Sequence, residues 1–388
     1  MAESQDWSEH EDIRETFQDF VSEIQDHRID RNKKHSVSEI LFLTITAMIC
    51  ACDGWRQIER FGQDKIEFLR EYFPYEHGTP SDDTLRLFFR SLDPAAAKAF
   101  LHRWAMSLNI DSTGRPTIAI DGKVLRGSHD GEESPLHLVT AYMSEHRIVL
   151  SQESVDKKSN EITAVPKLLE ALSIERAIVT IDAMGCQKEI ARQIQEKKGD
   201  YILALKGNQG TLYEDTKLLF TKEEVLAQYK LETEETTDKG HGRLEHRKIR
   251  SITIPKVLKE QHANWEGLES LIEIESTRTI KGLSTQEKRY YISSLKPEPG
   301  LMLKTIRNHW AIENSLHHVL DVTFREDDSR IRKKNAPKNM AIIRHMTLNL
   351  LQMEKKTTKT RDSLIILRKR SGWNEDALRR ILGHLHFI

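Results

Sequence analysis

Apolar positions in the first part of the chain recur at the three- and four-residue spacing of helices. Residues 40–52 are apolar except for threonines and follow Ser36-Val37-Ser38-Glu39, which has the form of a capping box. Residues 55–73 also show helical periodicity, and residues 84–92 follow a turn-forming Gly-Thr-Pro-Ser-Asp-Asp run. We therefore expect a helical N-terminal domain over residues 1–110.

The pattern changes near residue 116, where short β-branched runs alternate with helical segments. We expect strands at residues 117–121, 136–143, 147–152, 177–182 and 201–205, with helices at 159–172 and 187–198. Three strands followed by two helix–strand units is the element order of the ribonuclease-H-like fold. The first and fourth strands of that fold are parallel neighbours, so Asp121 and Asp182 at their ends should lie together.

The rest of the chain predicts an insertion and a helical end. Residues 232–250 are polar, and strand-like runs follow at residues 252–254, 270–277 and 289–293. Because a helix expected at 302–322 must return to the sheet, we interpret residues 230–295 as a β insertion within a catalytic domain of residues 111–352. Residues 353–388 are expected to form a basic helical tail. The fold class is therefore α/β, a mixed sheet with helices and an inserted β region.

Composition excludes several classes of protein. The chain is 31% charged and 38% hydrophobic, and its longest apolar run is too short to cross a bilayer, so no membrane partner is expected. Its acidic N-terminal segment has no apolar signal sequence, and its three cysteines lack a Cys-x-x-Cys pair. These features predict a protein of the reducing cytoplasm.

A net charge of −1 conceals an asymmetry along the chain. Residues 1–110 carry 13 basic and 20 acidic side chains, whereas residues 329–388 carry 15 basic and 4 acidic ones. The basic end is suited to DNA phosphates, with a solvated helical face as the alternative. Arg86 and Arg90 could belong to a helix-turn-helix reader, but we favour a plain helical bundle in which they pair with nearby acids.

Two aspartates carry the main chemical prediction. Asp121 follows Ile118-Ala119-Ile120 and Asp182 follows Ile178-Val179-Thr180-Ile181, and each precedes a small residue. Two carboxylates on neighbouring strands predict a divalent-metal site for phosphodiester cleavage. Glu313, on the helix expected at 302–322, is the preferred third ligand, and the acids of residues 326–328 are the alternative. Mg²⁺ is the expected ion, with Mn²⁺ as a substitute.

Several residues are expected to contact DNA. Lys123 and Arg126 follow the first strand, and Lys206 follows the strand at 201–205, so these cations are expected to face substrate phosphates. Arg307 and Trp310 precede Glu313 on its helix, where a cation and an indole could hold a phosphate and an unstacked base. A surface position without a role is the alternative for each cation. For the helix, the alternative is a core position for Trp310 and a salt bridge for Glu313. The 17 histidines lack zinc-ligand spacing, so no zinc is expected.

Short motifs along nearly the whole chain resemble those of one family, the H-repeat-associated insertion-sequence transposases of the DDE group. The motifs are Lys34-His35-Ser36-Val37-Ser38-Glu39-Ile40, Asp53-Gly54-Trp55, Ile120-Asp121-Gly122-Lys123, Ile181-Asp182-Ala183, Ala204-Leu205-Lys206-Gly207-Asn208-Gln209 and His309-Trp310-Ala311-Ile312-Glu313-Asn314. The resemblance implies a ribonuclease-H-like core with Asp121, Asp182 and Glu313 as its catalytic triad. It also implies Mg²⁺-dependent cleavage and strand transfer of double-stranded DNA, at element ends and target, by a homo-oligomer.

The chain departs from related cut-and-paste enzymes, whose signature helix reads Tyr-x-x-Arg-x-x-x-Glu-x-x-x-x-x-x-Lys. Ile306, His309 and Leu320 occupy the tyrosine, arginine and lysine places. The phosphate contacts of the signature therefore do not carry over, and we expect His309 and Arg307 to face the DNA instead. Two alternatives stay open from sequence, a catalytically inactive or domesticated DNA-binding relative and a general nuclease of the same fold.

Overall fold

The structure is a computed structural model of the chain. It describes residues 3–28, 33–108, 114–129, 131, 134–155, 160–240 and 242–386, with side chains from residue 10 onward. The predicted boundary near residue 110 and the predicted capping residue Ser159 lie outside the described residues. Within that part of the chain, no helix is both long and apolar enough to cross a membrane.

A nine-stranded mixed sheet forms the centre of the molecule, in the order β3-β2-β1-β4-β5-β9-β8-β7-β6. Strand β1 pairs antiparallel with β2 and parallel with β4, and β4 pairs parallel with β5. This half of the sheet has the ribonuclease-H-like arrangement predicted from the sequence. Its strands are β1 (Thr117–Leu125), β2 (Leu136–Met143), β3 (Ile148–Ser154), β4 (Ile178–Ile181) and β5 (Asp200–Leu205).

Asp121 does not end its strand, contrary to the prediction. The parallel pairing of β1 with β4 stops at Ile120 opposite Ile181, but the antiparallel pairing with β2 continues to Leu125. Asp121 and Asp182 therefore come directly after the last paired residues of two neighbouring strands. The parallel register therefore places the two residues at the same end of the β1–β4 pairing.

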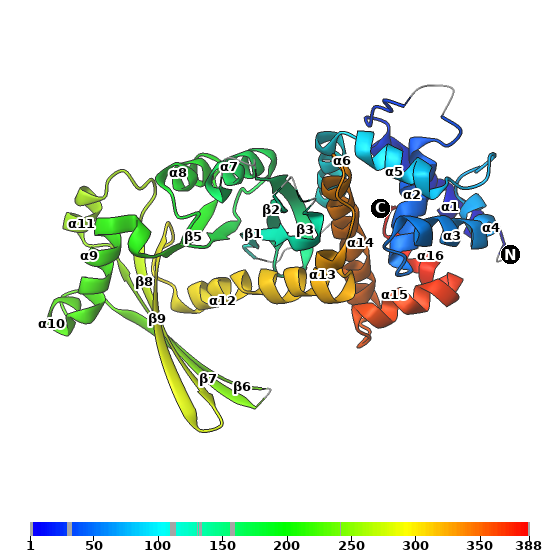
Figure 1. The fold of residues 1–388 in the computed structure, drawn as a ribbon. Coiled ribbons are helices and arrows are strands. Elements are labelled where there is room, and N and C mark those ends of the chain that lie inside the picture. Colours follow the sequence, from blue (N-terminus) through cyan, green and yellow to red (C-terminus); the bar gives the residue numbers. More distant parts are fainter. Residues whose placement is uncertain are drawn as a thin grey trace.

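The predicted β insertion contains more strand than the sequence pattern indicated. Its strands are β6 (Glu232–Gly240), β7 (Arg243–Thr253), β8 (Ser270–Ile280) and β9 (Leu283–Ser293), which we call the β arm. Residues 232–250, which the sequence identifies only as a polar segment, form β6 and most of β7. Their outer halves project away from the body of the molecule, so both faces meet solvent and apolar alternation is absent (Figure 1). Cross-strand ion pairs such as Lys248–Glu235 at 3.0 Å stabilise the pairing instead.

Helices cover both faces of the sheet (Figure 1). One face carries α7 (Glu161–Ala171) and α8 (Lys188–Glu196), and the other carries α12 (Pro299–His309) and α13 (His318–Thr323). Buried Met302, Leu303 and Ile306 pack α12 onto the central strands. At the base of the β arm lie the short helices α9 (Gly210–Thr221), α10 (Glu223–Leu226) and α11 (Lys256–Gln261).

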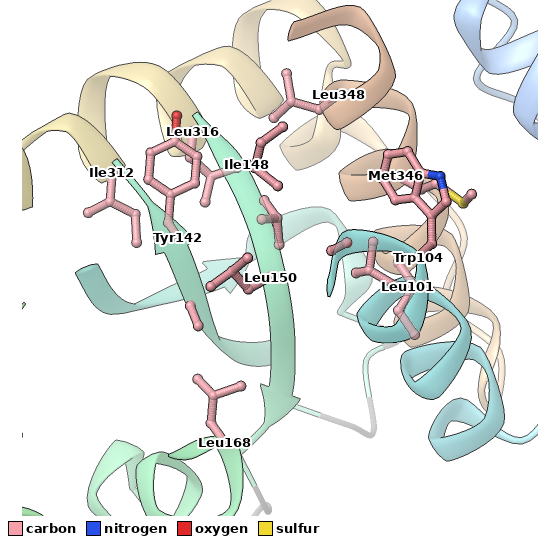
Figure 2. Packing of buried hydrophobic residues seen from close by; sticks show 14 of the residues in the cluster. Leu101, Trp104, Tyr142, Ile148, Leu150, Leu168, Ile312, Leu316, Met346 and Leu348 are labelled. Carbon is pink, nitrogen blue, oxygen red and sulfur yellow. The ribbon is translucent and has the colours of Figure 1, made fainter. Parts of the chain in front are cut away.

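The helix expected at residues 302–322 is interrupted. Between α12 and α13 the chain forms a π-helical segment, Ile312–His317, which accommodates one extra residue in the helix. Figure 2 shows Ile312 and Leu316 directed from this segment toward Tyr142 of β2. This apolar contact fixes the segment against the sheet and leaves the neighbouring Glu313 exposed.

The N-terminal part is helical, as predicted. Ser36 caps α2 because its hydroxyl accepts a hydrogen bond from the Glu39 N–H at 3.1 Å, and the Glu39 carboxylate accepts from the Ser36 N–H at 2.7 Å. The connection between α4 and α5 is longer than the three- or four-residue turn of a helix-turn-helix. The helices are α1 (Glu3–Val21), α2 (Val37–Ile49), α3 (Trp55–Asp64), α4 (Ile66–Arg70), α5 (Asp82–Ser91) and α6 (Pro94–Ser107).

The C-terminal helices join the two halves. Helix α14 (Ala336–Thr358) runs between the sheet and the N-terminal helices, where Figure 2 shows its Met346 beside Trp104 of α6. Helices α15 (Leu364–Trp373) and α16 (Glu375–Gly383) pack against α2. The chain end expected to be a basic tail is therefore packed on the N-terminal helices.

Candidate active site

Asp121, Asp182 and Glu313 line one cavity of about 430 Å³ between the sheet and α12. They come from three different elements, which are β1, the turn after β4 and the π-helical segment. The cavity also contains Lys206, His309, Trp310, Arg289, Tyr291 and Thr180. The fold thus brings together side chains that lie far apart in the sequence.

A tighter group within this cavity comprises Asp121, Glu313 and His317, whose ligand atoms all lie within 4.8 Å of one another. His317 Nδ1 lies 3.7 Å from Asp121 Oδ2 and 3.6 Å from Glu313 Oε2. The imidazole is buried, and its Nε2 has no hydrogen-bond partner within the described part of the chain. His317 is therefore placed to orient both carboxylates.

Asp182 lines the cavity but is not a member of that tight group. Its Oδ1 accepts hydrogen bonds from the N–H groups of Met184 at 3.0 Å and Gly185 at 3.2 Å. This local turn fixes the carboxylate at the end of β4 and leaves Oδ2 for another partner.

The electrostatics of Asp121 indicate a site that favours a cation. Burial and the neighbouring Glu313 carboxylate raise the pKa of Asp121 to about 7, and Asp182 adds to the effect, against a stabilising hydrogen bond from the Gly122 N–H. A divalent cation among these carboxylates compensates their repulsion. Carboxylate oxygens on rigid elements around a cavity are also the donor chemistry of Mg²⁺ and Mn²⁺ sites, so the residues fit such an ion.

The alternative third ligands lie elsewhere. Glu326 is buried and forms ion pairs with Lys123 and Arg344, each at 3.4 Å. Asp327 lies 3.6 Å from Lys123, and Asp328 pairs with Arg325 at 3.0 Å. These acids do not line the cavity of Asp121, so the geometry favours Glu313 over them.

The predicted cations have different surroundings. Lys123 is only 10% exposed at its side chain and lies within 3.6 Å of three carboxylates, including Asp321 at 2.5 Å. Arg126 is 84% exposed, with Asp327 at 3.7 Å. Lys206 is exposed and lines the cavity. Of the three, Lys206 and Arg126 can reach a ligand without breaking a buried ion pair.

The residues predicted on the third-acid helix also differ from one another. Arg307 pairs with Asp238 of the β arm at 3.0 Å. His309 Nδ1 lies 3.0 Å from Thr180 Oγ1, and burial lowers the pKa of His309 to about 4, so the ring is neutral at pH 7. Trp310 is 44% exposed and borders the cavity. The indole is thus the accessible member of this set.

Two residues of the site were missed from sequence. His317 shares a helix face with Glu313 at i+4 spacing, which was the signal available, but its contact with Asp121 depends on the tertiary fold. Arg289 of β9 places its guanidinium 4.5 Å from the centre of the Trp310 ring. Arg289 and Tyr291 are two residues apart and so lie on the same face of β9. Nothing in the sequence indicated that this face of the strand borders the cavity.

Three carboxylates around one cavity on a ribonuclease-H-like sheet define the class of metal-dependent enzymes that break and join phosphodiesters. Comparison with known proteins supports this assignment to a class. A family model described as "Transposase DDE domain" matches residues 112–350, and one described as "DDE_Tnp_1-associated" matches residues 18–105.

Relatives extend over most of the chain. It is 40% identical over 339 residues to "Putative transposase YncI" of Escherichia coli O157:H7, covering 86% of each chain. It is 38% identical to "H repeat-associated putative transposase YhhI" and 39% identical to "Putative protein YbfL", both of Escherichia coli K12, over 86% of this chain and 90% of each relative. The chain belongs to the DDE transposase family and is a transposase of the insertion-sequence type, a class that acts on DNA with a divalent metal ion.

Proposed function

We propose that this transposase cuts and joins double-stranded DNA at the ends and target of its element with Asp121, Asp182 and Glu313 as metal-binding catalytic residues. The observation that carries the proposal is the meeting of these carboxylates around one cavity from three separate elements. Mg²⁺ is the proposed ion and Mn²⁺ its substitute, because both accept carboxylate oxygens. When bound, the ion activates the attacking water or hydroxyl and neutralises the departing oxygen.

The surrounding residues have proposed roles in holding DNA. In this proposal Lys206, which lines the cavity, and the exposed Arg126, just beyond the end of β1, neutralise DNA phosphates. Trp310 offers an indole face to an unstacked base, and the Arg289 guanidinium supports that ring. Three further residues have indirect roles in this proposal, because their contacts hold the elements beside the DNA in place. Arg307 pairs with Asp238, and His309 contacts Thr180. Lys123 pairs with Asp321.

The larger organisation is proposed as follows. Residues 1–110 form a DNA-associated helical domain, residues 111–352 the catalytic domain and residues 353–388 a basic C-terminal helical part. A homo-oligomer acts on paired element ends, since two ends must be held together for joining.

The proposed location is the cytoplasm. The free cysteines Cys50, Cys52 and Cys186 agree with a reducing cytoplasm.

A cleavage assay tests the proposal. Purified protein with Mg²⁺ and a duplex carrying the element's end should produce nicks and joined products, and Asp121→Ala should lower both about a thousandfold or more. Glu189→Gln is the matched control, because Glu189 is exposed on α8 and does not line the cavity. Full activity of Asp121→Ala would contradict the assignment, and nicks without joined products would favour a general nuclease.

A further inference from the structure

A second concave surface, which shares no lining residue with the active-site cavity, is dominated by arginine. This groove of about 700 Å³ is formed between the N-terminal helices and the segment that follows α13. One wall includes Trp55, Arg86 and Arg90, and the other includes Arg325 and residues 328–333. We call it the arginine groove. Its basic lining residues are Arg86, Arg90, Arg325, Arg330, Arg332, Lys333 and Arg344.

The acidic residues of the groove are already engaged. Asp53 pairs with Arg368 at 2.5 Å, and Asp328 pairs with Arg325 at 3.0 Å. Two basic residues are likewise neutralised, because Arg86 pairs with Asp82 at 2.7 Å and Arg344 pairs with the buried Glu326. The groove therefore has no spare carboxylate among its described lining residues.

Three guanidinium groups keep an uncompensated charge. Arg90 and Arg330 have no ion pair within the described ranges. Arg332 Nε donates to the carbonyl oxygen of Gly127 at 2.9 Å, which orients the group without neutralising it. Planar, always charged guanidinium groups match phosphate oxygens in geometry and in charge.

The wall containing Arg330 and Arg332 is held against the strand that carries Asp121. The Arg126 N–H donates to Asp327 Oδ1 at 3.2 Å, just beyond the end of β1. A Cβ atom at Gly127 would lie 2.3 Å from the Asp327 carbonyl oxygen, so only glycine permits this backbone approach. The segment that forms one wall of the arginine groove is thus attached to the end of the strand that carries Asp121.

We propose that the arginine groove binds the phosphate backbone of duplex DNA outside the cleavage cavity and so holds the duplex in register with the carboxylates. The inference rests on the proposed cleavage function, because DNA is the polymer that both sites would share. A groove between two elements, with separated charges on both walls, suits a row of phosphates rather than one small anion. The contacts are to the backbone, so binding there does not depend on base sequence.

Binding measurements on the full chain test the proposal. The double variant Arg90→Gln/Arg330→Gln removes two charges without breaking an ion pair of the described residues. In EDTA, which prevents cleavage, it should bind a duplex of about 30 base pairs roughly tenfold or more weakly near 0.15 M salt, with the slope of log K against log salt reduced by about 2. The loss should be equal for an element-end duplex and an unrelated duplex.

The matched control is Lys188→Gln/Lys222→Gln, two exposed lysines that also have no ion pair among the described residues. Lys188 lies on α8, which covers the opposite face of the sheet from α12 (Figure 1), and Lys222 lies between α9 and α10. The control variant should bind as the wild type does. Wild-type affinity and salt slope in the Arg90/Arg330 variant would overturn the groove proposal, and so would a loss confined to the element-end duplex. Neither result bears on the cleavage assay of Asp121→Ala, so the two proposals fail separately.

Discussion

At the scale of single residues, one buried histidine makes the stability of the protein depend on pH. His345 of α14 is fully buried, and its Nδ1 has no hydrogen-bond partner in the described part of the chain. Burial lowers the pKa of His345 to about 3, and His317, Arg344 and Lys123 add to the effect. The ring is therefore neutral in the folded protein above about pH 3, whereas the same group in the unfolded chain is protonated below pH 6.5.

This shift predicts a loss of stability in acid. Because the folded pKa lies below the unfolded value of 6.5, the stabilising contribution is complete above pH 6.5 and is lost as the pH falls toward 3. Each pH unit in that window should lower the free energy of unfolding by about 1.4 kcal/mol for this group. Urea unfolding of wild type and His345→Gln at several pH values measures the effect, and the variant should show a shallower dependence.

Exposed His318 provides the control for this prediction, since it lies on the neighbouring helix. His318→Gln should keep the wild-type dependence on pH. An unchanged slope in His345→Gln would show that other groups account for the acid sensitivity.

Residue-level prediction from sequence succeeded where local pattern decides position. Asp121 and Asp182 follow β-branched runs, and the parallel register of β1 and β4 then places them together. It did not foresee the burial of Lys123, because its partners Asp321 and Glu326 lie about two hundred residues later in the chain. A lysine that stays exposed and a lysine that is buried in ion pairs can have the same neighbours in the sequence, so the local pattern does not distinguish them.

At the scale of elements, the π-helical segment is the feature most closely linked to catalysis. It places Glu313 next to His317 and Asp121, while Ile312 and Leu316 stay packed on the sheet (Figure 2). A π turn contains one residue more than the α turn it replaces. Removing one residue from the segment should convert it to an ordinary α-helical turn, so that α12 and α13 keep the same faces toward the sheet.

Deletion of Asn314 tests this view, since its side chain is exposed and donates only to the Trp310 carbonyl oxygen. The deletion variant should fold with nearly wild-type circular dichroism, yet lose about a hundredfold or more in nicking because Glu313 is displaced from Asp121. Asn314→Ala, which keeps the extra residue, should remain active. Equal activity of the deletion variant would show that the π turn has no catalytic role.

The β arm shows where element prediction from sequence was incomplete. Residues 270–277 and 289–293 were recognised because their apolar side chains face the core. Residues 232–250 were not recognised, because the strands they form are stabilised by cross-strand pairs such as Arg247–Asp238 at 2.7 Å. Pairing between distant residues of this kind leaves no periodic signal in a single sequence.

At the scale of the whole molecule, one buried side chain joins three distant parts of the chain. Arg368 of α15 is 2% exposed and donates to the Met48 carbonyl oxygen at 2.7 Å, to Asp53 at 2.5 Å and to the Thr323 carbonyl oxygen. Its guanidinium also lies 4.1 Å from the centre of the Phe324 ring. The N-terminal helices, the end of the catalytic helix and the C-terminal helices meet at this residue.

Loss of that charge should destabilise the protein as a whole. Arg368→Met keeps the volume but leaves Asp53 and two carbonyl oxygens without their donor, which should cost about 3–5 kcal/mol of unfolding free energy. Lys369→Met, at the exposed neighbouring position, should change it by less than about 0.5 kcal/mol. Thermal unfolding measures both, and equal midpoints for the two variants would contradict the role given to Arg368.

Metal binding tests the central account most directly, because it asks whether Asp121 and Glu313 form one site. Isothermal titration of Mn²⁺ should show binding to the wild type and to Asp328→Asn. Asp121→Asn and Glu313→Gln should each lower the affinity about tenfold or more, since each removes an anionic ligand. Wild-type affinity in Glu313→Gln, with binding lost only in Asp121→Asn, would contradict the three-carboxylate site.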